Sequence, residues 1–184
     1  EIMLVRANEA SETVTFHTEP EAITLNVKDF GAFGDGVHDD TSAIQAAILC
    51  CPENARVLIP KGTYPVTALF LKSDMILELQ ENAVLAGIYD RARTPILPGQ
   101  IEYDNEDGYY NLGSWEGNPI DSFASMITGI HVKNVTICGK GVLDGRADFE
   151  NWWSRPKDKI RAWRPRMIFL NHCENITVVG VTVQ

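Results

Sequence analysis

Short runs of apolar residues, each four or five positions long, recur from residue 56 to the end of the chain and are separated by turn-forming residues. Runs of this length, rich in Val, Ile and Leu, predict many short strands joined by turns. The expected strands cover residues 56–59, 68–71, 75–79, 83–86, 123–127, 135–138, 166–170, 176–179 and 181–184.

Two of these strands lie in segments that nearly repeat one another. The segment HVKNVTICG at residues 131–139 matches HCENITVVG at residues 172–180, and SDMILEL at residues 73–79 is a weaker third copy. Repeats of this kind predict a solenoid whose coils stack and whose additional residues loop out on one side. Asn134 and Asn175 suit the tight turns between strands, where left-handed geometry or side-chain ladders are needed.

One segment, residues 41–51, has a helical period instead. Its apolar residues fall on a single face at spacings of three and four, and they are Ile44, Ala47, Ile48 and Cys51. Asp39 or Asp40 is the expected N-cap, and Pro52 helps to end the helix. We expect this helix to cap the solenoid, because the first coil otherwise has unpaired edges and exposed apolar side chains.

The remaining segments set the domain organisation. Residues 13–18 alternate like an exposed edge or sandwich strand, and Glu-Pro-Glu at residues 19–21 resembles a linker. We therefore divide the chain into a residual strand and linker at 1–21 and a solenoid domain at 22–184. Two long segments interrupt the repeats at residues 90–119 and 146–165, and both are rich in aromatic residues. Long loops on a regular scaffold are often functional.

Charge and cysteine usage narrow the possible partners. The net charge of −9 makes nucleic acid a poor partner, and no apolar run reaches membrane-spanning length. A polyanionic substrate would need a local cationic patch, and residues 155–166, which we call the basic run, hold six cations against one acid.

The four cysteines are Cys50, Cys51, Cys138 and Cys173. They form no CxxC pair, so we expect no zinc site. We interpret them as buried thiols, and the alternative is a disulfide framework.

Two stretches resemble known families. The sequence NVKDFGAFGDGVHDDTSAIQAAILCCPENARVLIPKGTY at residues 26–64 resembles the opening of the pectate-lyase-like parallel β-helix proteins. GKGVLDG at residues 139–145, followed by Trp152-Trp153 and then Arg164-Pro165-Arg166, resembles glycoside hydrolase family 28, the polygalacturonases. The resemblance covers about residues 24–184. It implies an all-β fold, a right-handed parallel β-helix, with exo-acting, inverting hydrolysis of α-1,4-galacturonan (pectin) and no metal or other cofactor.

The resemblance also bears on the ends of the chain. Residues 13–18 are similar to the last strand of a fibronectin type III-like module, which precedes the β-helix in some bacterial exo-acting pectinases. The chain starts on Glu1 and ends on Gln184 within a strand pattern, so we interpret it as the N-terminal fragment of a longer enzyme. Free cysteines and the absence of a visible signal peptide favour the bacterial cytoplasm over secretion. The sequence does not indicate an oligomeric state.

Four residues are candidates for binding an acidic polysaccharide or oligogalacturonide. Arg164 and Arg166 could bind galacturonate carboxylates through two hydrogen bonds each, and the indoles of Trp153 and Trp115 could pack on sugar rings. The alternative is a solvated loop whose tryptophans pack on the scaffold and whose cations pair with the acidic surplus of the protein. Both interpretations stay open at this point.

No catalytic residue is assigned within this chain. The family's Asn-Thr-Asp, Gly-His-Gly and Arg-Ile-Lys motifs are absent, and Asp39-Asp40 lacks the context of the family's Asp-Asp pair. We interpret Asp144 as closing a turn, the acids near residue 39 as turn and cap residues rather than a cation site, and His172 as a ladder or core residue. The resemblance therefore places the catalytic carboxylates beyond Gln184, and we expect the fragment alone to be inactive.

Other functions fit the same scaffold. One alternative is a different enzyme of acidic polysaccharides, such as a rhamnogalacturonan hydrolase or a polysaccharide lyase. Another is a non-catalytic solenoid that only binds glycan, such as a tailspike segment. Fold by itself does not separate these from a polygalacturonase.

Overall fold

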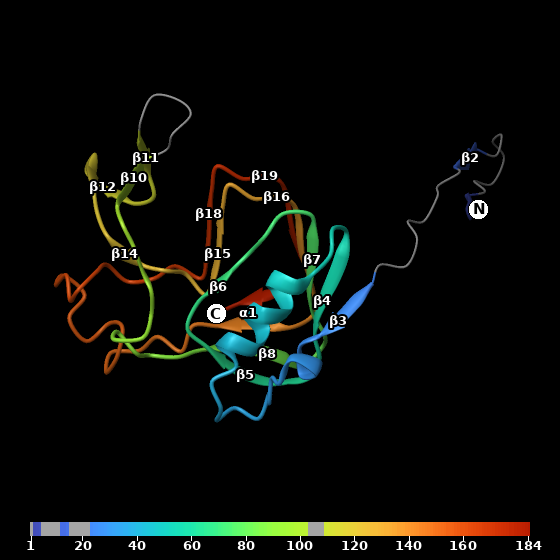
Figure 1. Ribbon diagram of the computed structural model, residues 1–184, viewed down its shortest axis with the longest axis horizontal. Coiled ribbons are helices and arrows are strands. Elements are labelled where there is room, and N and C mark those ends of the chain that lie inside the picture. Colours follow the sequence, from blue (N-terminus) through green and yellow to red (C-terminus); the bar gives the residue numbers. More distant parts are fainter. Residues whose placement is uncertain (1, 5–11, 15–22, 103–108) are drawn as a thin grey trace.

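The computed structural model describes residues 2–4, 12–14, 23–102 and 109–184. Within them, three parallel sheets form the walls of a solenoid (Figure 1). The first sheet has the order β19-β16-β7-β4-β3, with bounds Glu174–Val179, Lys133–Gly139, Met75–Leu79, Ala55–Ile59 and Thr24–Asn26. The second has the order β20-β17-β8-β5, with bounds Thr182–Val183, Val142–Asp144, Ala83–Gly87 and Gly62–Val66. The third has the order β18-β15-β6, with bounds Ile168–Asn171, Ile127–Ile130 and Leu69–Phe70.

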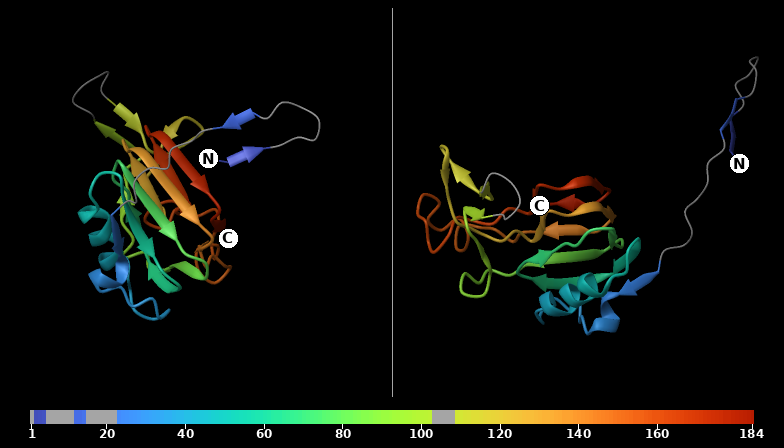
Figure 2. Two further views of the ribbon diagram at one scale, coloured as in Figure 1. Left: turned by 90° about the vertical axis from the view of Figure 1, so that its right-hand side faces the viewer. Right: turned by 45° about the horizontal axis from the view of Figure 1, so that its top comes forward.

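The chain visits the three sheets in turn, which makes a right-handed parallel β-helix, as the sequence predicts. Successive coils stack on one another (Figure 2). Their strands are in register, so that Val57 pairs with Leu77 and Leu77 with Ile137. All three side chains are fully buried, and a buried aliphatic side chain of this size contributes about 1.5–3 kcal/mol. The core of the solenoid is therefore a set of apolar columns that run from coil to coil.

The corners between the third and first sheets use left-handed residues at matching positions. Asp74, Asn134 and Asn175 all have positive φ, and their side chains form a ladder. Asn175 Nδ2 donates to Asn134 Oδ1 at 3.0 Å, and Asn134 Nδ2 donates to Asp74 Oδ1 at 2.6 Å. The rings of His131 and His172 stack with centroids 5.2 Å apart in the same corner. The asparagine prediction is confirmed, and His172 is a ladder residue.

Helix α1 (Thr41–Cys50) covers the N-terminal end of the stack (Figure 2). Ile44, Ala47 and Ile48 are fully buried, which confirms the predicted face. The Gln45 side chain accepts a hydrogen bond from Phe70 N and donates one to Phe70 O, so it pairs the free edge of β6 in the way that another strand would. The helix therefore caps the solenoid as predicted, both through buried apolar side chains and through hydrogen bonds to the free strand edge.

The two acidic residues before α1, Asp39 and Asp40, have different hydrogen-bonding roles. Asp40 occupies the N-cap position, but its carboxylate accepts from Phe33 N and Gly34 N and makes no cap hydrogen bond. The Asp39 carboxylate accepts from Thr41 N at 2.9 Å instead. The prediction that these acids serve the turn and the helix start is confirmed, although the turn depends on Asp40 and the helix start on Asp39.

Several strands differ from those predicted. Residues 123–127 are not one wall strand: β14 (Ser122–Phe123) pairs antiparallel with β9 (Ile96–Leu97), and the wall strand β15 begins only at Ile127. Strands β5 and β17 were not predicted because Gly, Pro and Asp in them indicate turns. Pro65 is tolerated because β5 is the edge strand of its sheet.

Further elements lie outside the three walls. A short 3-10 helix, η1 (Val27–Phe30), follows β3. The first insertion holds two hairpins, β10 (Gln100–Glu102) with β11 (Tyr109–Asn111) and β12 (Ser114–Trp115) with β13 (Asn118–Pro119). At the N-terminus, β1 (Ile2–Leu4) pairs with β2 (Glu12–Val14), while residues 15–18 of the predicted strand lie outside the described residues. The domain division at residue 21 stays a prediction.

The cysteines are free thiols in different environments. Cys51 is buried, Cys138 and Cys173 are partly buried, and Cys50 is exposed. Burial raises the pKa of Cys51 and of Cys138 above the ordinary thiol value. The expectation of buried thiols is therefore wrong for Cys50, which lies on the solvent face of α1. No helix among the described residues has the length and apolar character that a membrane span requires.

Candidate functional site

Two insertions leave the solenoid at the same edge, between the second and third sheets. The first comprises residues 88–126 and connects β8 to β15, and the second comprises residues 145–167 and connects β17 to β18. They meet beside the walls (Figure 1). They share a small core of their own, made of Phe123, Trp152 and Ala162. Neither insertion continues the wall pattern, and the shared core joins the two into one lobe.

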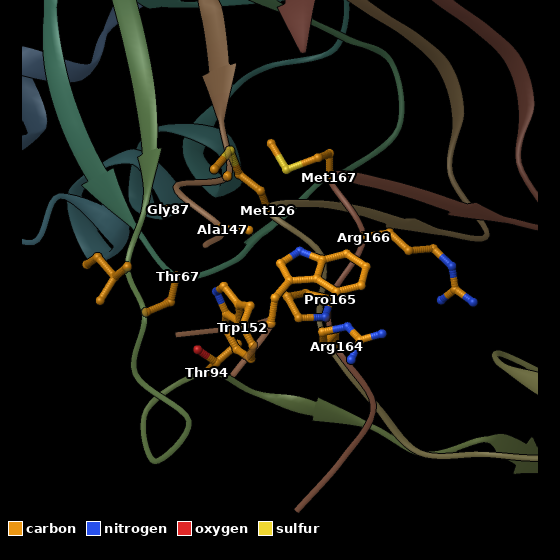
Figure 3. Close-up of a pocket in the computed structure, with 13 residues that line it drawn as sticks. Thr67, Gly87, Thr94, Met126, Ala147, Trp152, Arg164, Pro165, Arg166 and Met167 are labelled. Atoms are coloured by element: carbon orange, nitrogen blue, oxygen red, sulfur yellow. The ribbon is translucent and has the colours of Figure 1, made fainter. Parts of the chain in front are cut away.

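A cavity of about 100 Å³, which we call the insertion cavity, lies where the lobe meets the walls (Figure 3). Its lining includes Met126 and Met167, the residues that immediately precede β15 and β18. The second insertion contributes Trp152, Trp153 and Arg164. The complete lining is Thr67, Gly87, Ile88, Thr94, Met126, Gly145, Ala147, Trp152, Trp153, Arg164, Pro165, Arg166 and Met167.

The structure brings three of the four predicted binding residues to this cavity. The Arg164 guanidinium lies 4.2 Å from the centroid of the Trp153 ring, and its Nη1 donates to the Pro156 carbonyl at 2.7 Å. The Arg166 guanidinium lies 5.5 Å from the Phe169 ring of β18, and the Arg166 backbone N–H donates to Ser125 Oγ. Aromatic faces thus orient both guanidiniums, which lowers the entropy cost of binding an anion.

The cations of the basic run fall into two groups. Arg155 pairs with Asp158 at 3.6 Å and Lys159 pairs with Asp121 at 3.7 Å, so their charges are partly neutralised. The second group forms no ion pair with any carboxylate in the described part of the chain, and it consists of Lys157, Arg161, Arg164 and Arg166. The alternative in which cations pair with the acidic surplus is therefore correct for the first group only.

Trp115 lies apart from the cavity. It is 64% exposed on the β12–β13 hairpin and stacks on Trp163, with ring centroids 6.4 Å apart and planes at 17°. The exposed Trp115 indole, backed by the half-buried Trp163, presents a flat apolar surface on the same lobe. The role of Trp115 in substrate binding stays a prediction. Trp163 belongs to the same surface and was not among the predicted binding residues.

Asp144 is engaged in a local turn after β17. Its Oδ1 accepts from Arg146 N at 2.9 Å, and its Oδ2 lies 4.0 Å from Arg146 Nε. This geometry agrees with the turn interpretation.

Near the N-terminal cap of the solenoid, hydrogen bonds from the backbone N–H groups of His38 and Val37 hold the pKa of Asp35 well below its usual range. The described residues contain no group of His, Cys, Asp and Glu side chains that could hold a metal ion.

If the complete protein has the glycoside hydrolase activity that the sequence resemblance implies, replacing Asp144 by asparagine should leave that activity nearly unchanged. The amide keeps an oxygen that can accept from Arg146 N, and the turn interpretation gives the carboxylate no part in proton transfer. Under that implied activity we expect kcat on the galacturonan substrate to stay within about twofold, where loss of a general acid or base would cost about 100-fold or more. Initial rates of reducing-end release measure this, and a 100-fold loss with an unchanged thermal midpoint would contradict it.

The cavity includes residues that sequence reasoning missed. Met126, Pro165 and Met167 reach it because they lie at the points where the chain re-enters the third sheet. Their only sequence signal is their place just before a wall strand, and the start of β15 was itself predicted wrongly.

Comparisons with known proteins agree with the fold. A family model described as rhamnogalacturonase A/epimerase, pectate lyase-like, matches residues 24–148. An exo-poly-alpha-D-galacturonosidase of Dickeya chrysanthemi is 37% identical over 148 residues, which are 80% of this chain and 23% of that protein. The mannuronan C5-epimerase AlgE6 of Azotobacter vinelandii is 52% identical over 64 residues, 34% of this chain and 7% of that protein.

A solved structure adds to this. The family 28 exopolygalacturonase of Yersinia enterocolitica is 29% identical and superposes with a TM-score of 0.74, over 92% of this chain and 36% of that one. The chain thus spans well under half the length of each of these three proteins.

Proposed function

Because the chain belongs to the rhamnogalacturonase A/epimerase, pectate lyase-like family, we propose that it forms the N-terminal coils of an exo-acting polygalacturonase that hydrolyses α-1,4-galacturonan. The Dickeya relative is an exo-poly-alpha-D-galacturonosidase and the Yersinia relative an exopolygalacturonase, which supports this activity class. The observation that carries the proposal is the pair Arg164 and Arg166, two guanidiniums without a carboxylate partner among the described residues, at the rim of the insertion cavity.

Charge explains why this pair points to an acidic glycan. The protein carries −9 overall, so a polyanion is repelled except where cations are concentrated. Galacturonan has one carboxylate on each sugar, and a guanidinium binds a carboxylate through two parallel hydrogen bonds. Trp153 offers an apolar ring beside Arg164 for the face of a sugar. The same groups would be a poor match for a neutral glycan.

These residues would bind and orient the substrate, while the chemistry needs two further carboxyl groups. In an inverting hydrolase one acid protonates the leaving oxygen and a carboxylate activates water, about 6.5–9.5 Å apart. Asp144 is engaged in its turn, and Asp39 and Asp40 lie at the capped end. We therefore propose that the acid and the base belong to other coils of the complete protein.

The test is an assay of the complete protein on a panel of acidic polysaccharides. We expect reducing ends from polygalacturonate, small saturated products from the chain end and inversion at the anomeric carbon observed by NMR. Unsaturated products would indicate a lyase, and activity on rhamnogalacturonan alone would indicate the related hydrolase. Epimerised alginate would favour the activity named for the Azotobacter relative, and binding without any product would support a glycan-binding solenoid. Each of these outcomes would overturn the proposal.

A further inference from the structure

Arg91, in the first insertion, reaches across to the second. Its guanidinium carbon lies 4.7 Å from the Trp152 ring centroid and 5.6 Å from that of Phe123, so it sits against the small core that the insertions share. Its Nη1 donates to the carbonyl of Ile160 at 3.3 Å. In the opposite direction, Arg161 Nη1 donates to the Arg91 carbonyl.

No carboxylate forms an ion pair with Arg91 in the described part of the chain. The half-buried guanidinium is held by aromatic faces, by the Ile160 carbonyl and by the Tyr89 hydroxyl, which accepts from Arg91 Nε at 3.4 Å. The Tyr89 ring is a third aromatic face, at 5.6 Å. Cation–π contacts strengthen as they are desolvated, and a planar guanidinium stacks on rings better than an ammonium does. Arg91 therefore contributes to packing between the insertions rather than to surface charge.

The contact between Arg91 and Trp152 lies next to the Trp153–Arg164 pair, which lines the insertion cavity. Trp152, which Arg91 covers, is 6% exposed, and the next residue, Trp153, is 44% exposed and stacks on Arg164. Trp153 follows Trp152 directly in the chain, so a restraint on Trp152 also restrains the position of Trp153. Arg164 stacks on the Trp153 ring and is positioned with it. We infer that Arg91 is a positioning residue that fastens the second insertion and so places the Trp153–Arg164 pair for galacturonan; the last step rests on the proposed function.

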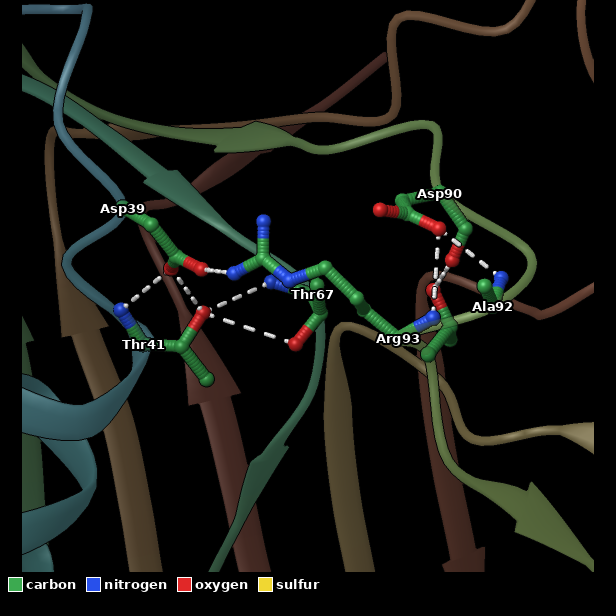
Figure 4. Close-up of polar contacts among 7 residues, drawn as sticks. Asp39, Thr41, Thr67, Asp90, Ala92 and Arg93 are labelled. Carbon is green, nitrogen blue, oxygen red and sulfur yellow. Dashed lines mark hydrogen bonds and ion pairs between the residues drawn. The ribbon is translucent and has the colours of Figure 1, made fainter.

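Arg93 offers a matched control in the same loop. It pairs with Asp39 beside the start of α1, where Asp39 also accepts from Thr41 (Figure 4). This contact fastens the base of the first insertion to the cap and involves no residue of the second insertion. Replacing Arg93 removes one arginine from the same segment without touching the Arg91 contacts.

The first measurement needs no activity. Trypsin should cleave after Lys157 or Lys159 in the exposed part of the second insertion when that insertion loosens. In the complete protein we expect Arg91→Met to raise the cleavage rate about tenfold or more, because local opening exposes the chain to the protease. Arg93→Met should cleave at the wild-type rate. Equal rates in wild type and Arg91→Met would overturn the inference, as would an equal increase in both variants.

The second measurement separates positioning from general damage. We expect Arg91→Met to raise KM for polygalacturonate about tenfold and to change kcat less than twofold, because only the placement of binding groups changes. In an Arg164→Ala background the same substitution should add little, since it acts through the group already removed. Full additivity, or an unchanged KM despite faster cleavage, would overturn the positioning role.

The two failures can be told apart. If the wild-type protein does not hydrolyse polygalacturonate, the proposed function fails, and the trypsin comparison still supports or overturns the fastening of the second insertion by Arg91.

Discussion

Replacing Arg164 or Arg166 by alanine in the complete protein should weaken galacturonan binding strongly, and the loss should shrink as salt rises. A charge-assisted hydrogen bond in a partly desolvated site is worth about 1–3 kcal/mol, so each substitution should raise KM about 5- to 100-fold. Salt screens exposed charges over about 10 Å at 0.1 M, which reduces the difference from wild type. KM measured on polygalacturonate at low and high ionic strength tests both parts.

Lys140 provides the control for this experiment. It is an exposed cation in the turn between β16 and β17, outside the residues that line the insertion cavity. Lys140→Ala changes the net charge by the same amount, so a purely global charge effect would raise KM equally in all three variants. If Arg164→Ala and Arg166→Ala keep wild-type KM and kcat at low salt while staying folded, the basic run is only a solvated loop.

Replacing Gly139 by alanine should destabilise the solenoid severely. Gly139 has a φ of +108°, and a Cβ there would lie 1.9 Å from the carbonyl oxygen of Leu79 in the coil beneath. Backbone must move to relieve that contact, and the coils above and below are in register with it. Left-handed strain of about 1–2 kcal/mol and overpacking of about 1–3 kcal/mol together predict a loss of roughly 2–5 kcal/mol. Urea unfolding of the complete protein measures it.

Gly31 separates the two causes. Its φ is +93°, close to that of Gly139, but an added Cβ would meet no atom within 4 Å. Gly31→Ala should therefore show the backbone strain alone, about 1–2 kcal/mol. If Gly139→Ala lost no more stability than Gly31→Ala, the close stacking of coils at this corner would not matter to stability.

The sequence predicted the solenoid because its determinants are local and repeated. The residues around Asn134 and Asn175 share one pattern, and equal patterns stack in register as parallel strands. The face of α1 followed from its period of three and four residues, and the turn role of Asp144 from its Asp-Gly neighbourhood. The strand at 123–127 failed because Phe123 packs against Trp152 of the other insertion rather than in the wall, and that contact has no local signal.

The binding residues show the same division. The sequence by itself determined that cations and tryptophans gather in residues 152–166 and that a polyanion would need them. Only the tertiary structure decided which cations have carboxylate partners, since Asp121, which pairs with Lys159, lies in the other insertion. It also decided that Trp153 joins the arginines at the cavity while Trp115 does not, and that Arg91 belongs with Trp152. Local repeats encode the coils, whereas the two insertions are far apart in the sequence and are brought together by the stacking of the coils. Their contacts therefore have no local sequence pattern.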